Sequence, residues 1–174
     1  MAATISPSVK ENNEIIKIII DAQISRGLDY KAVIDYSACK DSLWDGVVIF
    51  SLPDPAEHPK RAKMVYNLIG IVERLGFNVE VTTKDDVDPR LNELIERALN
   101  QKQPLTELIL GTGDRDHSYM IKKILRLKTI KVTIVVGDGL YLASQYNKIA
   151  QQNGGLKIFS FPRKRRALPM KICS

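Results

Sequence analysis

The sequence predicts an α/β fold of three layers, in which a mostly parallel central sheet is flanked by helices on both faces. Short apolar runs rich in β-branched residues alternate along the chain with longer amphipathic segments, and glycines and prolines separate them. Strands that alternate with helices are joined by right-handed crossovers, which make neighbouring strands parallel. A chain of 174 residues has the length of one domain with a sizeable core.

The N-terminal third of the chain sets the predicted domain limits. Asn12 to Ser25 carries isoleucines at helical spacing, which predicts a helix. Lys31 to Asp35 is a short apolar run, which predicts a buried strand ending at an acid. We therefore expect a helical extension over residues 1–28, packed on a domain over residues 29–161, with a basic tail over residues 162–174.

The remaining segments predict a regular alternation of strand and helix. In the segment from Arg61, five apolar side chains recur on one face before Gly76 ends the helix. Further strands are expected at Gly46 to Leu52, Phe77 to Thr83, Leu108 to Leu110, Thr129 to Val136 and Leu156 to Phe159. Helices are expected at Arg61 to Leu75, Pro89 to Asn100, Asp116 to Leu127 and Leu140 to Gln152.

Composition indicates a folded cytoplasmic protein. Hydrophobic residues make up 44% of the chain and charged residues 26%, which is typical of a globular domain and unlike a disordered chain. The apolar runs are far shorter than the roughly 20 residues of a membrane-spanning helix, so no membrane partner is expected. Cys39 and Cys173 belong to no Cys-x-x-Cys pair, and we expect both thiols to be reduced.

A net charge of +6 favours a polyanionic partner, and the expected partners are RNA or DNA. The sequence is also compatible with a homo-oligomer. The positive charge lies just before two predicted helices, within the second of them, and in the tail. The candidate contacts to nucleic-acid phosphates are Lys84, Arg115, Lys122, Lys123, Arg163, Lys164, Arg165 and Arg166.

Aspartates follow three predicted strands at the edge where ligands bind in open parallel sheets. They are Asp35, then the group Asp85, Asp86 and Asp88, then the pair Asp114 and Asp116. Carboxylates that converge would repel one another unless a cation neutralised them. Oxygen ligands suit hard divalent cations, so the sequence predicts a site for Mg²⁺ or Mn²⁺.

Two other interpretations use the same residues. Each aspartate before a helix could cap that helix, which contributes about 1 kcal/mol. Gly111-Thr112-Gly113 after a strand is part of a dinucleotide-binding fingerprint, but Asp116 stands at the position of the third glycine. Acids there would oppose a pyrophosphate, which disfavours the dinucleotide interpretation.

Three of these segments resemble the signatures of the NYN domain, a group within the PIN-like nuclease superfamily. They are Val33-Ile34-Asp35, Lys84 to Asp88 before an amphipathic helix, and Leu110 to Asp116, with Thr112-Gly113-Asp114-Arg115-Asp116 the most specific. The likeness covers residues 31–159. It implies a PIN-like fold and a metal-dependent ribonuclease, in which the metal-binding and catalytic acids are Asp35, Asp88, Asp114 and Asp116.

The sequence departs from the family pattern in four places, and in one of them Leu127-Lys128 lacks the family's glycine before a strand. Tyr36 and Ala38 stand where the family has a small residue and an asparagine, and His117 stands where phenylalanine is common. We therefore carry two hypotheses. The first is a nuclease, expected to act on RNA, that hydrolyses phosphodiester bonds with Mg²⁺ or Mn²⁺. The alternative is a catalytically weak or inactive nucleic-acid-binding or assembly protein on the same fold.

Overall fold

The described residues form one parallel sheet of six strands. The structure, a computed structural model, describes residues 15–23, 27–38, 43–137 and 142–163. The strand order is β3-β2-β1-β4-β5-β6, and every pair of neighbours is parallel. The strands are β1 (Ile15–Asp21), β2 (Leu43–Ser51), β3 (Asn78–Thr82), β4 (Leu105–Gly111), β5 (Lys131–Val136) and β6 (Leu156–Ser160).

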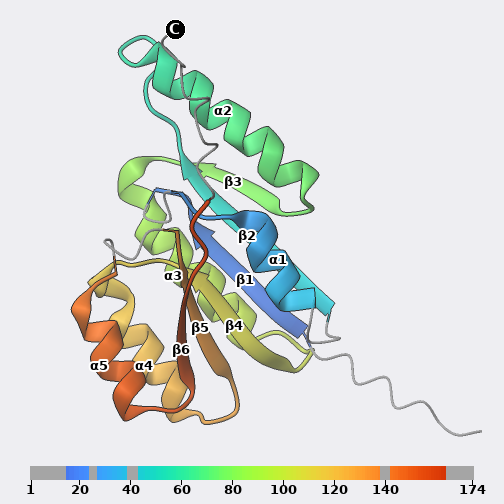
Figure 1. Cartoon of the computed structure of the whole chain (residues 1–174), viewed down its shortest axis with the longest axis vertical. Coiled ribbons are helices and arrows are strands. Elements are labelled where there is room, and N and C mark those ends of the chain that lie inside the picture. The colour runs from blue at the N-terminus through green and yellow to red at the C-terminus, as the bar shows by residue number, and fades with distance from the viewer. Residues whose placement is uncertain (1–14, 24–26, 39–42, 138–141, 164–174) are drawn as a thin grey trace, which may run out of the picture.

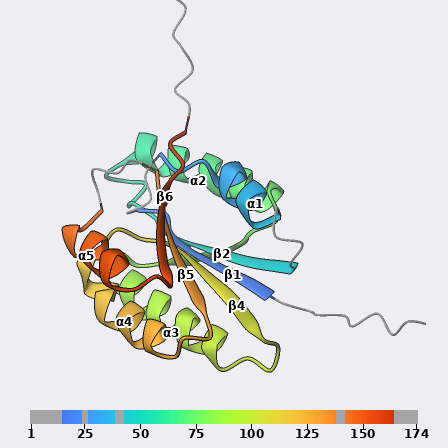
Figure 2. The same ribbon diagram turned by 60° about the horizontal axis from the view of Figure 1, so that its bottom comes forward.

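Helices cover both faces of this sheet, which confirms the predicted three layers. One face carries α1 (Tyr30–Ala38) and α2 (Pro59–Arg74), and the other carries α3 (Val87–Leu99), α4 (Ser118–Arg126) and α5 (Ser144–Gln152) (Figures 1 and 2). Each face has its own apolar core, because alternate residues of the buried strands point to opposite sides. No helix among the described residues is long and apolar enough to cross a membrane.

The predicted N-terminal helix is wrong, because Ile15–Asp21 is the strand β1. The strand lies at the centre of the sheet between β2 and β4, so the predicted extension contributes a central strand of the domain itself. Five of its first six residues are isoleucines, and four of these five are at most 1% exposed. A run that is apolar on every side suits a strand buried on both faces, and its β-branched side chains favour extended backbone.

The predicted strand over residues 31–35 is also wrong, because this segment lies within the helix α1. The backbone N–H of Ala32 donates to Oδ1 of Asp29 at 3.1 Å, in the manner of a helix cap. Tyr30, Val33 and Ser37 are buried at helical spacing. Asp35 therefore lies on a helix surface and not at a strand end.

From β2 onward the predicted elements are confirmed, with shifts of a few residues at their ends. The predicted start of the last helix, at Leu140, falls outside the described residues. One local interpretation changes. Asp88 was expected to cap a helix beginning at Pro89, but α3 begins at Val87, so both residues lie in its first turn. Proline fits there because the first backbone N–H groups of a helix have no partner within the helix.

The strand order creates a crevice at the carboxyl ends of β1 and β4. The chain lays down β1, β2 and β3 toward one edge, and α3 then crosses to the opposite face before β4 pairs with the other side of β1. Connections leaving β1 and β4 thus go to opposite faces of the sheet, which is the arrangement at which ligands bind in such folds. Ile20 is paired with Gly111, so the two strands end at the same level.

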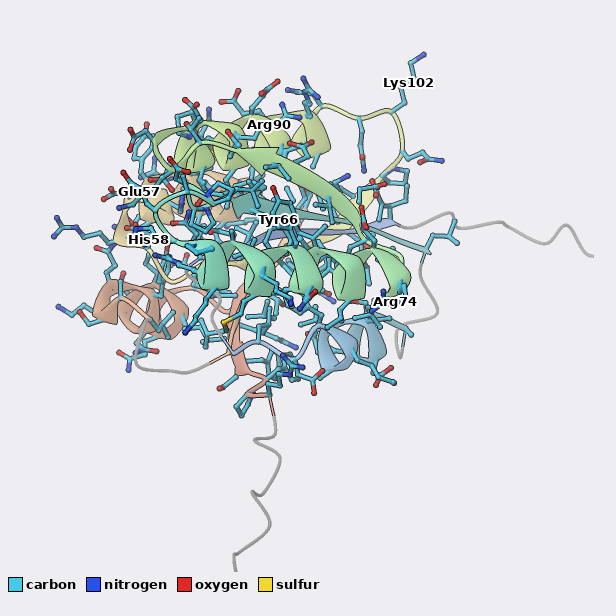
Figure 3. The ribbon with its side chains drawn as sticks, turned by 90° about the horizontal axis from the view of Figure 1, so that it is seen from above. Glu57, His58, Tyr66, Arg74, Arg90 and Lys102 are labelled. Carbon is cyan, nitrogen blue, oxygen red and sulfur yellow. The ribbon has the colours of Figure 1, made fainter. Side chains whose placement is uncertain are left out.

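Arg90 links the edge strand β3 to α3. Its guanidinium donates to Oε1 of Glu80 at 2.7 Å and also contacts Glu93 (Figure 3). The hydrogen bond from Arg90 lowers the pKa of Glu80 below its ordinary value of 4.5. A carboxyl group with a lowered pKa in the folded state stabilises the protein above its unfolded pKa, and this contribution is lost as the pH falls.

We therefore predict that Glu80→Gln makes the protein less stable at pH 7 by about 1 kcal/mol or less, since the pair is partly exposed. The variant should lose less stability than the native protein between pH 5 and about pH 3, because the titrating carboxyl group is gone. Urea unfolding at pH 7, pH 5 and about pH 3 measures both effects. The control is Glu96→Gln, at an exposed position on α3, the helix that carries Arg90. Equal pH dependence in all three proteins would contradict the prediction.

Gly111 allows β1 and β4 to approach closely at the crevice. A Cβ atom at this position would lie 2.6 Å from Cγ2 and 3.0 Å from Cβ of Ile20. Ile20 is fully buried and branched at Cβ, so its side chain cannot turn away. The glycine is therefore required by packing between the two strands.

We predict that Gly111→Ala destabilises the protein by about 1–3 kcal/mol through overpacking. Gly154→Ala is the matched control, because a Cβ there meets no atom within 4 Å. Thermal and urea unfolding of both variants provide the measurement. A Gly111→Ala protein as stable as the Gly154→Ala protein would show that the strand ends have room to spare.

Candidate metal centre

Three of the predicted acids come together beside the crevice. Asp88, Asp114 and Asp116 each place one carboxylate oxygen within 4.8 Å of the others. Asp88 comes from the first turn of α3. Asp114 lies in the loop after β4, directly before the 3₁₀ turn Arg115–His117, and Asp116 lies within that turn. Segments more than twenty residues apart in the chain thus build one acidic cluster.

The loop after β4 is shaped by its own polar side chains. The N–H of Asp114 donates to Oγ1 of Thr112 at 3.3 Å, and Thr112 is fully buried. Oδ1 of Asp114 in turn accepts from the N–H of Asp116 at 3.1 Å, so Asp114 caps the 3₁₀ turn as the capping interpretation expected. These bonds fix the backbone of the loop that carries both acids.

Helix α5 holds this loop from outside. The Tyr146 hydroxyl donates to the carbonyl of Asp114, and Nε2 of Gln145 donates to the carbonyl of Arg115 at 2.7 Å. The N–H of Ala143, just before the helix, donates to the carbonyl of Gly113 at 3.0 Å. Three consecutive carbonyls of the acidic loop are thus bound by the start of α5.

His117 joins the acidic loop to α3. Its ring is 1% exposed, with Nδ1 3.2 Å from Oδ1 of Asn92 and Nε2 3.2 Å from Oδ1 of Asp88. Oδ1 of Asn92 can only accept, so Nδ1 donates to it. Nε2 is buried and faces the carboxylate without hydrogen-bond alignment. The histidine therefore lies between the acidic loop and α3, in contact with Asn92 and beside the carboxylate of Asp88.

The cluster fits a small hard cation. Two oxygens on opposite sides of a Mg²⁺ ion, each bound at about 2.1 Å, are about 4.2 Å apart. Oxygens within 4.8 Å of one another therefore need only small side-chain rotations to share one ion. Asp88 and Asp114 are partly buried and Asp116 is exposed, which leaves the site open on one side.

Asp35, the fourth predicted acid, is not part of this group. Its carboxylate is exposed on α1 and forms an ion pair with Lys31 at 2.8 Å, one helical turn earlier. The expected position at the end of the first strand belongs to Asp21 instead. Asp21 is 3% exposed and accepts from the N–H of Gln23 at 2.8 Å. Since Ile20 pairs with Gly111, Asp21 ends β1 level with Thr112.

The predicted basic contacts that are described lie on four different segments. Arg115 is exposed in the acidic loop itself, 3.7 Å from Asp116. Lys84 is exposed in the 3₁₀ turn before α3, and Lys122 and Lys123 are exposed on α4. The last predicted group is the basic run over residues 163–166. Arg163 is described and is exposed. Lys164, Arg165 and Arg166 fall outside the described residues.

Comparisons with known proteins support the fold alone. No family model matches the chain, and no curated protein does. Among solved structures, the chain is similar to a protein of unknown function from Vibrio parahaemolyticus, with a TM-score of 0.57 and 22% identity. The similarity covers 86% of this chain and 95% of the other. The same arrangement of strands and helices therefore recurs in a chain of distant sequence.

Sequence reasoning missed four residues that build this region, namely Asp21, Asn92, His117 as a buried residue, and Tyr146. Asp21 could have been found, since a β-branched run that ends at an acid is typical of a strand end. His117 and Asn92 carry no signal in sequence, because their contact depends on α3 crossing beneath β1. Tyr146 likewise meets Asp114 only through the packing of α5.

Tyr146 gives a test of this support. Burial raises the pKa of its phenol above the ordinary value of 10.0, and the charges of Asp114 and Asp116 raise it further. The hydroxyl therefore stabilises the fold fully below pH 10, and this contribution is lost as the pH rises above that value.

We predict that Tyr146→Phe costs about 1 kcal/mol at pH 7, because the Asp114 carbonyl loses its donor. The variant should also lose less stability than the native protein when the pH is raised from 9 to 11. Urea unfolding across this range measures both effects. Tyr66→Phe, at a half-exposed position on α2, is the matched control, and a Tyr146→Phe variant that behaves like it would contradict the proposed support.

Proposed function

We propose that this chain is a divalent-metal-dependent nuclease that hydrolyses phosphodiester bonds, with RNA as its substrate. Asp88, Asp114 and Asp116 would hold Mg²⁺ or Mn²⁺. The observation that carries the proposal is the convergence of these three carboxylates beside the β1/β4 crevice. When bound, such a cation lowers the pKa of a coordinated water and neutralises charge on the leaving oxygen.

The residues around the cluster would each have a defined part. The Asp114 loop is bound by Tyr146, and Asp88 lies in the first turn of α3 beside the buried ring of His117, so the fold would place these acids before any ion binds. Positioning of this kind limits the reorganisation that binding and reaction require. The exposed face of Asp116 leaves a side open to water and to a phosphate.

Asp21 replaces Asp35 as the candidate acid from the first strand. It ends the central strand, and the small residue Ala22 follows it, which resembles the family pattern better than Asp35 followed by Tyr36 does. The departures noted at Tyr36 and Ala38 counted from Asp35, so they lose their basis with it. The position three residues after Asp21 is Ile24 and not the family's asparagine.

Basic side chains supply an approach for a polyanion. Arg115 and Lys84 lie on the two segments that carry the acids, and Lys122 and Lys123 extend the positive charge along α4. Charges of this kind would bind backbone phosphates without reading bases, so binding should weaken as salt rises. A cytoplasmic location and a homo-oligomer stay predictions.

We expect Asp114→Asn to reduce Mn²⁺-dependent cleavage of labelled RNA by about 100-fold or more, because it removes a charge from the ion site. The native activity should vanish in EDTA and return with added Mn²⁺. Asp35→Asn should keep native activity, because its carboxylate is paired with Lys31 away from the cluster. Product formation on denaturing gels, with circular dichroism as the folding check, measures both.

Other results would change the assignment. Equal loss in both variants would restore Asp35 to the site. RNA retained in a shift assay without any products would favour the nucleic-acid-binding protein over the enzyme. Cleavage that is insensitive to EDTA would exclude the acidic cluster as the source of activity.

A further inference from the structure

A second concave site lies on the other side of β1 from the acidic cluster. It is a cleft of about 580 Å³ between α2 and the segments that follow β1 and β2. This volume falls in the range of about 300–1,000 Å³ that is usual for small-molecule sites. Ala22 and Gln23, which line it, follow Asp21 directly, so the cleft begins at the end of the central strand.

The walls of the cleft are apolar, and the space between them is open. Leu28, Tyr30 and Phe50 form part of its lining and are almost fully buried, and Leu68 belongs to the facing wall on α2. Met64, on the same helix, is 71% exposed. Figure 3 shows α2 in the foreground. Among the described residues of α2, only Ala62 and Val72 are buried. This part of α2 therefore presents apolar surface that the sheet does not cover.

The polar groups of the cleft are neutral or positive. Arg61 and Arg163 line it, and neither has an ion-pair partner among the described residues. The described lining includes no aspartate or glutamate, while Gln23, Ser51 and Asn67 offer amide and hydroxyl groups. A ligand that fits would combine an apolar, hydrogen-bonding body with an anionic group.

Tyr30 connects this cleft to the strand end. It lines the cleft. Burial raises the pKa of its phenol, and the negative charge of Asp21 raises it further. The phenol therefore stays protonated at neutral pH. The acidic cluster approaches the same edge of the sheet from β4, since Ile20 and Gly111 are paired.

We propose that this cleft binds one nucleotide of the substrate, with the base against the apolar walls and the phosphate at Arg61 and Arg163. The inference rests on the proposed function for the identity of the substrate. Bases bind between apolar side chains and are recognised by amide and hydroxyl groups, and arginine pairs with phosphate through two parallel N–H donors. The cleft would therefore hold one nucleotide of a substrate that reaches over the carboxyl end of β1.

The test measures nucleotide binding apart from catalysis. AMP and UMP are titrated separately into the full chain in EDTA by calorimetry, so the metal site contributes nothing. We expect at least one of them to bind, and Arg61→Ala to weaken that binding by about tenfold or more. Arg74→Ala, on the same helix outside the cleft, should bind like the native protein.

A second variant guards against misfolding. Met64→Glu places a negative charge at an exposed position of the cleft, so it should fold and yet abolish binding. The inference is overturned if neither nucleotide binds, or if Arg61→Ala behaves like Arg74→Ala. It is also overturned if sedimentation shows a dimer that Met64→Glu dissociates, since a second copy would then occupy the cleft.

The two proposals fail separately. Nucleotide binding in EDTA without any RNA cleavage would remove the nuclease proposal and leave the cleft as a nucleotide site. Metal-dependent RNA cleavage without nucleotide binding in the cleft would do the opposite.

Discussion

The structure depends on the pairing of β1 with both β2 and β4. β1 is buried on both faces, and its isoleucines contribute to both apolar cores. Because the chain passes from one face of the sheet to the other between the strands on either side of β1, the crevice must open at this strand. Gly111 lets the two strands meet closely there, so the position of the acidic loop follows from the packing of Ile20.

The acidic cluster needs support because its carboxylates repel one another. That support comes from two contacts. Tyr146 on α5 donates to the backbone carbonyl of Asp114, and His117 of the acidic loop bonds to Asn92 on α3, the helix that carries Asp88. Each contact joins segments distant in the chain, so the cluster exists only in the folded domain. Its geometry is therefore as stable as the packing of α3 and α5 on the sheet.

The parts that sequence reasoning predicted correctly are those with a local signal. Strands and helices after β2 have clear periods and turn residues, and the acids after β4 sit in a distinctive turn. β1 was misread because isoleucines on every side satisfy helical spacing as well as strand burial. α1 was misread because a short apolar run has no period of its own, although the spacing of Lys31 and Asp35 is that of an ion pair along a helix. Contacts such as His117 with Asn92 depend on topology and leave no trace in sequence.

The path of the chain divides the two candidate sites between two stretches of sequence. The acids and their supports come from residues 84–146, whereas the cleft is lined almost entirely by residues 22–71, with Arg163 as the exception. In the sheet, β1 stands between the strand β2 that contributes to the cleft and the strand β4 that leads into the acidic loop. Substitutions on α2 could therefore change which ligand the cleft binds without altering the acidic cluster. Homologous chains could then differ in the ligands they recognise and still share the same candidate metal site.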